Sequence, residues 1–288
     1  MTATASPTTN KYRFASSLRP FSLIIAVGCC GIAFARTFPE ADFSAPLAIL
    51  TFTATLLAQC GVNLINDWSD QHQPELRLNC DQIQAIRRNF VLGMACFAFA
   101  AVIGSAIMLM RGPVIALLAM AGFAGCLAYT IEPFNLKRRG LGLILVFVLM
   151  GPLLITGAGF SATGNWSQTL LLDSIAFGPL ISLVLMANEI RDIEKDLRHG
   201  DRTLSSILGL PRAKLAFLAL LGLTAAGYIT LISLGHLNSP LWMSGSLVFA
   251  LFLAYRLLQM HSITSRRNLP QLAGRLTGVT ALCHLLSI

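Results

Sequence analysis

Carboxylates grouped on one face of a helix can hold a metal ion, and this sequence contains two such clusters. In the first, Asp67 and Asp70 follow Asn63 by four and seven residues. On a continuous helix these spacings place all three side chains on one face. Oxygen ligands of this kind suit Mg²⁺, which proteins often hold through one or two carboxylates together with the phosphate groups of a substrate.

The second cluster repeats the pattern further along the chain. Asn188, Asp192 and Asp196 recur at every fourth position and again share one helix face. The asparagine of each cluster lies one turn nearer to an apolar segment, where a polar side chain without a partner is costly. A merely hydrated helix end does not account for that asparagine. We therefore expect four metal-binding, catalytic carboxylates: Asp67, Asp70, Asp192 and Asp196.

Other acidic residues nearby lack this pattern. We expect them to be hydrated side chains at helix ends, namely Glu75, Asp81, Glu194 and Asp201. Asn66 and Glu189 lie beside the two acidic faces. For both residues a role in the site and a purely structural role remain open.

Three consecutive basic residues, Lys137, Arg138 and Arg139, lie between the two clusters. Adjacent cations suit a diphosphate, although a purely topological role is equally consistent for Arg139. Arg202 follows the second cluster, where a bend near Gly200 would return it to the site. The sequence contains no Ser/His/Asp arrangement and no glycine-rich phosphate loop that would indicate another chemistry.

The composition indicates whether these clusters belong to a soluble protein or to a membrane protein. Charged residues make up 12% of the 288 residues and hydrophobic residues 55%, and the mean hydropathy is +0.69. A typical soluble domain has roughly 25% charged residues. These values exclude a disordered protein, a coiled coil and an ordinary soluble enzyme, and they predict an all-α polytopic membrane protein in contact with the lipid bilayer. We attribute the net charge of +8 to cytoplasmic loops and expect no nucleic-acid partner.

Nine apolar segments are candidates for transmembrane helices, each of which needs ~20 residues to cross the hydrocarbon core. They are 20–36, 45–66, 89–110, 113–131, 140–160, 169–188, 213–235, 239–257 and 272–288. The last is the weakest, because Arg275 and His284 interrupt it. The first also resembles a signal peptide, but Arg19-Pro20 and the long polar leader argue against that alternative.

The charges predict the orientation of these segments. With the N-terminus in the cytoplasm, 19 of the 21 Lys and Arg residues and ten of the 13 acidic residues lie on the cytoplasmic side. We therefore expect an integral protein of a bacterial inner (plasma) membrane with its active site on the cytoplasmic side. The clusters lie 125 residues apart, which predicts a four-helix repeat, about 20–131 and 140–257, within a single domain 1–288 that ends in helix 272–288.

Four stretches together resemble the UbiA superfamily of intramembrane aromatic prenyltransferases: 18–20, 66–70, 129–142 and 188–209. The last is most similar to the MenA branch, which prenylates 1,4-dihydroxy-2-naphthoate in menaquinone biosynthesis. The resemblance implies about nine transmembrane helices around a central cavity. It also implies that two Asp-rich motifs hold Mg²⁺ and a prenyl diphosphate, with an aromatic acceptor as second substrate.

The resemblance also implies roles for single residues. The residues expected to bind the diphosphate are Asn63, Tyr129, Lys137, Arg138, Asn188 and Arg202. The chain departs from the family pattern at Pro74, where an Asp is common, and at Leu143, where MenA-like proteins often have Glu. Ile131-Glu132-Pro133 replaces a common Gly-Gly-Pro. These departures concern the acceptor more than the chemistry.

Several alternatives remain open from the sequence. Within the superfamily, 4-hydroxybenzoate, homogentisate or another quinone or lipid precursor would be the acceptor in place of the naphthoate. A CDP-alcohol phosphotransferase would need a DGxxAR-type motif and one compact acidic cluster, which the sequence lacks. A cation-coupled transporter would place its acids near the middle of the membrane rather than at the ends of spans. The oligomeric state is not predicted.

Overall fold

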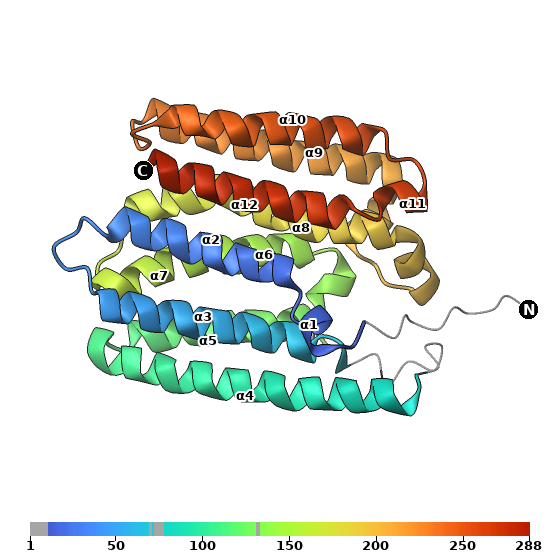
Figure 1. The fold of residues 1–288 in the computed structure, drawn as a ribbon, viewed down its shortest axis with the longest axis horizontal. Coiled ribbons are helices and arrows are strands. Elements are labelled where there is room, and N and C mark those ends of the chain that lie inside the picture. The colour runs from blue at the N-terminus through green and yellow to red at the C-terminus, as the bar shows by residue number, and fades with distance from the viewer. Residues whose placement is uncertain (1–10, 69–70, 72–77, 131–132) are drawn as a thin grey trace, which may run out of the picture.

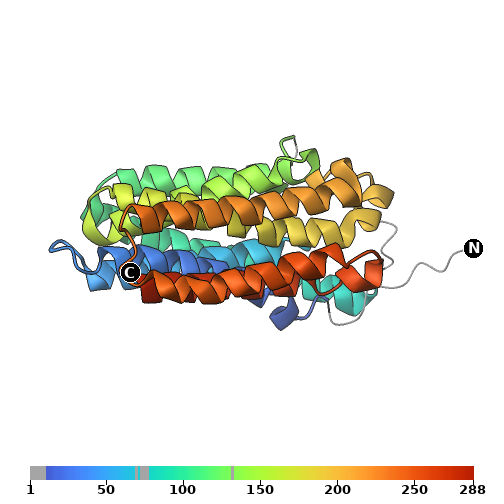
Figure 2. The same cartoon turned by 90° about the horizontal axis from the view of Figure 1, so that it is seen from above.

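The protein is a bundle of long helices that run side by side along one direction (Figures 1 and 2). The computed structural model describes residues 11–68, 71, 78–130 and 133–288, and within these ranges it contains helices and no strand. The long helices are α2 (Pro20–Thr37), α3 (Ala45–Ile65), α4 (Cys80–Arg111), α5 (Val114–Thr130), α8 (Gln168–His199), α9 (Leu204–Ser233), α10 (Met243–Leu258) and α12 (Leu269–Ser287).

Shorter helices complete the bundle. They are α1 (Phe14–Ser17), η3 (Leu136–Arg139), α6 (Gly142–Val148), η4 (Leu149–Leu153), α7 (Leu154–Thr163), η5 (Pro240–Trp242) and α11 (Ile263–Arg266). The segment η4 is a π-helical turn that joins α6 to α7 around Pro152. Proline has no N–H to donate, so a local widening of the helix at this residue is expected.

Each of the nine expected apolar segments overlaps a helix, but several helices extend beyond them. Thus α4 begins at Cys80 rather than at residue 89, and α8 continues to His199 rather than ending at 188. Asn79 and Gln82 form a reciprocal capping box that fixes the start of α4. The expected boundaries followed hydropathy, whereas helices can continue through polar residues outside the hydrocarbon.

In the part of the chain that the structure describes, six helical spans are long and apolar enough to cross a membrane: Ala45–Ile65, Cys80–Arg111, Gly142–Thr163, Gln168–His199, Leu204–Ser233 and Pro240–Leu258. Two further apolar helices, Ser22–Thr37 and Val114–Tyr129, are shorter. The prediction of an all-α, membrane-spanning protein is therefore confirmed. The count of nine spans and the cytoplasmic N-terminus remain predictions.

Helix α8 is the central element of the bundle. In its most apolar stretch 78% of the residues are buried, against 11% in α4. It packs against α9, α12, α6 and α2, whereas α4 exposes large apolar side chains such as Leu109. An exposed apolar surface of this kind is what lipid contact requires. The second acidic cluster is therefore carried by the innermost helix.

Candidate active site

The first acidic cluster lies where α3 ends. The helix stops at Ile65, so Asp67 is held in the following turn and not on a continuing helix, as the one-face pattern assumed. Asn63, on the last turn of α3, is buried and donates from Nδ2 to the carbonyl of Leu18 at 2.7 Å and to Ser22 Oγ at 2.6 Å. It therefore ties the cluster to the segment that enters α2. Asp70 and Glu75 lie outside the described residues.

Arg19 binds the carboxylate of this cluster. Its Nη2 lies 3.1 Å from Asp67 Oδ1, and Asp67 is buried. With its amide oxygen turned toward the guanidinium, Asn66 accepts from the same group. Arg19 has φ 49°, a left-handed conformation that is unfavourable for a residue with a side chain. Strain of this kind is often found at functional sites. The sequence contained no signal that paired Arg19 with Asp67.

The second cluster lies on one continuous helix, as predicted. Arg191 pairs with Asp192 through two contacts, Nη2 to Oδ2 at 2.6 Å and Nε to Oδ1 at 2.8 Å. Asp196 Oδ2 accepts from Thr203 Oγ1 at 2.9 Å. Asn188 instead donates to the Val184 carbonyl of its own helix at 2.9 Å.

Lys137 connects the two clusters electrostatically. It lies in η3, and the charges of Arg19 and Asp196 both act on its ammonium group. Burial lowers the pKa of Lys137 from its usual value, and the nearby Arg19 cation lowers it further, while Asp196 opposes this shift. A cation from the middle of the sequence thus lies in electrostatic range of Asp196 in the second cluster and of Arg19, the partner of Asp67 in the first.

The other expected basic residues lie around Lys137. Arg138 forms an ion pair with Asp201, Nε to Oδ1 at 2.8 Å, which joins η3 to the segment after α8. That segment bends at Gly200, whose φ of 72° favours glycine. Arg202 is exposed and lines a cavity of about 270 Å³ beside Asp201. The expected bend is present, and it places Arg202 beside Asp201, the partner of Arg138.

Tyr129 and Glu189 are two further polar groups near the acidic clusters. Tyr129, near the end of α5, is within electrostatic range of Glu189 and of Arg19. Glu189 is 5% exposed, and its Oε2 accepts from the Ser205 amide at 3.0 Å. Its Oε1 is buried without a hydrogen-bond partner in the described part of the chain. The sequence left the role of Glu189 open.

Two acids that were expected to be only hydrated form ion pairs. Glu194 Oε1 accepts from Arg266 Nη2 at 2.5 Å, and Asp201 pairs with Arg138. Arg266 is 1% exposed and also donates from Nη1 to the Ile190 carbonyl at 2.8 Å. The short α11 is therefore anchored to α8 on the side away from Asp192.

The chemistry of the donor set fits Mg²⁺. Asp67, Asp192 and Asp196 offer hard carboxylate oxygens, and Lys137 and Arg138 add charge for an anion. Within the described residues, no three acidic, His or Cys side chains converge closely enough to form a metal site. One predicted ligand, Asp70, lies outside those residues, and the carboxylates that are described are paired with protein groups.

A second polar region lies at the opposite end of the bundle. There Asp173 on α8, fully buried, accepts from Arg36 Nε at 2.9 Å and Nη2 at 3.0 Å. Arg36 Nη1 also donates to the His236 carbonyl at 2.8 Å. His284 Nε2 lies 3.5 Å from Asp173, and His284 Nδ1 lies 3.0 Å from the Tyr228 hydroxyl. We call Arg36, Asp173, Tyr228 and His284 the buried polar network.

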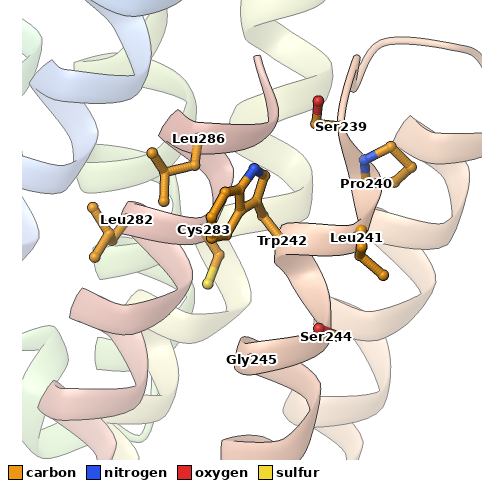
Figure 3. A pocket seen from close by; sticks show the side chains of 9 residues that line it. All are labelled: Ser239, Pro240, Leu241, Trp242, Ser244, Gly245, Leu282, Cys283 and Leu286. Atoms are coloured by element: carbon orange, nitrogen blue, oxygen red, sulfur yellow. The ribbon is translucent and has the colours of Figure 1, made fainter.

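A cavity of about 770 Å³ opens near this network, between the start of α10 and the end of α12. Figure 3 shows Leu241 and Trp242 on one helix and Leu282, Cys283 and Leu286 on the other, with the Trp242 ring turned toward Cys283. No charged side chain is among its lining residues. The cavity is thus separate from the acidic clusters.

One family model matches most of the chain. The model of the UbiA prenyltransferase family matches residues 22–273. The chain therefore belongs to the UbiA prenyltransferase family.

Individual relatives are more distant. The chain is 28% identical over 192 residues to the 1,4-dihydroxy-2-naphthoate octaprenyltransferase of Mycobacterium tuberculosis, a match covering 64% of this chain and 65% of that protein. The matched part is therefore slightly less than two thirds of the relative's length.

Solved structures share the whole fold. A UbiA homolog from Aeropyrum pernix superimposes with a TM-score of 0.70 at 18% identity, covering 95% of this chain and 98% of the other. A UbiA homolog from Archaeoglobus fulgidus bound to DMAPP and Mg²⁺ gives 0.61 at 15% identity, covering 96% and 100%. At these identities the similarity supports the fold alone.

Proposed function

We propose that this protein transfers a prenyl group from a prenyl diphosphate to an aromatic acceptor, and that it requires Mg²⁺. The observation that carries this proposal is the basic helix η3, which contains Lys137 and Arg138 and which the Arg138–Asp201 ion pair holds beside the end of α8 that carries Asp192 and Asp196. Cations between two groups of carboxylates suit a diphosphate bound together with divalent metal ions.

The residues divide into two groups by role. Asp67, Asp192 and Asp196, with Asp70, would hold the metal. When bound, Mg²⁺ would offset the negative charge that develops on the diphosphate as the allylic C–O bond breaks. Asn63, Tyr129, Lys137, Arg138, Asn188 and Arg202 are proposed for binding the diphosphate end of the substrate.

Lys137 and Arg138 would also stabilise the negative charge that develops on the diphosphate. Both are cations on the short η3, and Arg138 is held in place by Asp201. Fixed cations that face a leaving group stabilise the transition state, since they need no reorganisation as charge develops. The apolar bundle around α8 would exclude water and so protect the allylic cation from hydrolysis before an aromatic ring carbon attacks it.

For the acceptor we propose 1,4-dihydroxy-2-naphthoate, as in menaquinone biosynthesis. The support is the naphthoate relative and the similarity of 188–209 to the MenA branch. Another aromatic acceptor is the alternative, because Leu143 replaces a common Glu. Leu143 is 6% exposed and packs in the apolar core, so no acidic group is present there. We place the protein in a bacterial inner membrane with the acidic clusters on the cytoplasmic side.

Prenyl transfer measured in membranes that contain this chain tests the proposal. Radiolabelled farnesyl, geranylgeranyl and longer prenyl diphosphates are supplied with dihydroxynaphthoate, hydroxybenzoate or homogentisate, in Mg²⁺ or in EDTA. We expect a lipid-soluble product that requires Mg²⁺ and dihydroxynaphthoate. Product with a different acceptor would overturn the acceptor assignment only. The absence of product from folded protein with every acceptor would overturn the proposed activity.

A further inference from the structure

The side chain of Glu189 is held firmly but is only half satisfied. Its Oε2 accepts from the backbone amide of Ser205, in the first turn of α9, at 3.0 Å. Its Oε1 is buried and lacks a hydrogen-bond partner among the described residues. A buried carboxylate oxygen without a partner carries an unfavourable desolvation free energy. The Ser205 hydroxyl also acts on this carboxylate, but its Oγ, like Glu189 Oε1, is buried without a hydrogen bond of good geometry among the described residues, so one acceptor and one hydroxyl remain unsatisfied at the same place.

The groups around Glu189 indicate what Oε1 can bind. Tyr129 and Lys137 lie within electrostatic range of Glu189, yet neither forms a hydrogen bond or an ion pair with it in the described structure. A metal ion at Oε1 is disfavoured, because the Lys137 cation acts on the same carboxylate. A neutral hydroxyl is suited to this position, since it can donate to Oε1 and accept from a cation or a phenol.

The depth of Glu189 agrees with a site for the acceptor ring. It precedes Asp192 by three residues and Asp196 by seven, which corresponds to about 4.5 and 10.5 Å along the helix. A diphosphate bound through metal ions at Asp192 and Asp196 would place its reacting carbon near that level. The acceptor ring must lie against this carbon, and a hydroxyl on the ring is what makes it electron-rich.

We propose that Glu189 binds a hydroxyl group of the aromatic acceptor, with Oε1 accepting the hydrogen bond while Oε2 stays on the Ser205 amide. This inference rests on the proposed prenyl transfer and goes further by assigning the recognition of a ring hydroxyl to one residue. The ligand class is accordingly a phenol or naphthol. An aromatic ring whose corresponding oxygen is methylated is expected to bind poorly.

The test compares dihydroxynaphthoate with its two mono-methyl ethers, at saturating Mg²⁺ and geranylgeranyl diphosphate, in purified protein in lipid nanodiscs. For the wild-type protein we expect one ether to have a KM at least about tenfold above that of the parent acceptor. Glu189→Gln keeps the size and one oxygen of the side chain. We expect it to raise the KM of the parent about tenfold, reduce the preference over that ether to below about threefold, and leave the KM of the diphosphate within twofold.

A matched variant separates recognition from stability. Glu194→Gln makes the same chemical change on the same helix, at a side chain that is 42% exposed and paired with Arg266. It should retain the wild-type preference for the hydroxyl. If Glu189→Gln does not fold, the ether series on the wild-type protein and on Glu189→Asp still tests the inference. A wild-type protein that does not distinguish either ether from the parent would overturn it.

The outcomes also distinguish this inference from the proposed function. If the wild-type protein transfers prenyl groups but Glu189→Gln keeps the full preference for the hydroxyl, only the role of Glu189 is wrong. If Glu189→Gln raises the KM of the acceptor and the KM of the prenyl diphosphate equally, Glu189 serves to hold α9 in place. That result would likewise overturn the inference. If the folded wild-type protein transfers no prenyl group to any acceptor, the proposed function fails and the role of Glu189 fails with it.

Discussion

The two ends of α8 each carry an aspartate paired with an arginine, and the two pairs differ in their exposure to solvent. Near its start, Asp173 is fully buried and bound by Arg36 through two hydrogen bonds. Near its end, Asp192 is 32% exposed and pairs with its sequence neighbour Arg191. Nineteen residues separate the two aspartates, or about 29 Å of helix. One helix therefore carries a closed ion pair at one end and an accessible one at the other.

This difference distinguishes a structural role from a binding role. Arg36 and Asp173 join α2 to α8, and removing either partner would leave a charge in the interior. The pairs at the acidic end use more exposed arginines, since Arg19 is 43% and Arg191 35% exposed. The Arg191–Asp192 pair, whose side chains are 35% and 32% exposed, contributes only about 0–1 kcal/mol, so a cation and a diphosphate can displace it. In this structure Arg19 and Arg191 neutralise Asp67 and Asp192.

The largest expected effect comes from the acidic end. Asp192→Asn should reduce prenyl transfer by at least about 10²-fold, because it removes a charge that stabilises the diphosphate as it leaves. Asp67→Asn should behave in the same way. Transfer rates in membranes, normalised to the amount of inserted protein, measure this. Asp81→Asn is the control, since Asp81 is exposed in the first turn of α4. Near-normal activity of either variant would exclude that aspartate as a metal ligand.

The opposite end should respond in stability instead. Asp173→Asn leaves the Arg36 cation without a buried counter-charge and should lower the free energy of unfolding by about 3–5 kcal/mol. The KM values of the protein that remains folded should stay near wild type. Thermal unfolding in detergent, with activity assayed at low temperature, measures both quantities. The double variant Arg36→Met with Asp173→Leu should recover most of the stability. Loss of turnover in stable Asp173→Asn protein would contradict a purely structural role.

The charge of Lys137 should be visible in the pH dependence. Because burial and Arg19 lower its pKa, Lys137 loses its proton at a lower pH than an ordinary lysine. Affinity for the prenyl diphosphate should therefore fall on the alkaline side, starting below the usual lysine range. Lys137→Arg should move that limb to higher pH, and Lys137→Met should raise the KM of the diphosphate about tenfold at neutral pH. An unchanged alkaline limb in Lys137→Arg would exclude Lys137 as its source.

Sequence patterns predicted the second acidic cluster better than the first. The four-residue spacing of Asn188, Asp192 and Asp196 depends only on helical periodicity, and α8 is continuous through it. The first pattern assumed the same continuity, but α3 ends at Ile65. A local spacing does not reveal where a helix stops when no glycine or proline marks the end.

Contacts between distant segments could not be predicted at all. Arg19 reaches Asp67 across 48 residues through a left-handed backbone conformation that the sequence does not specify. His284 was taken as a weakness of the last apolar segment. The structure instead buries it with Nδ1 3.0 Å from the Tyr228 hydroxyl, so this polar side chain in an apolar helix has a hydrogen-bond partner on α9. A hydropathy scale assigns a transfer free energy to each residue separately, and it does not account for a hydrogen-bond partner on another helix.

The smallest expected effect lies at the edge of the acidic end. Asp201→Asn removes the ion pair to Arg138. The Asp201 side chain is 21% exposed and the Arg138 side chain 44%. A pair this accessible contributes about 0–1 kcal/mol, so the unfolding free energy should change by no more than that. Arg138 would lose its anchor but remain charged, and the KM of the prenyl diphosphate should rise by less than about threefold. Both effects should diminish at high salt, where exposed charges are screened. A loss of turnover as large as that of Asp192→Asn would instead place Asp201 among the metal ligands.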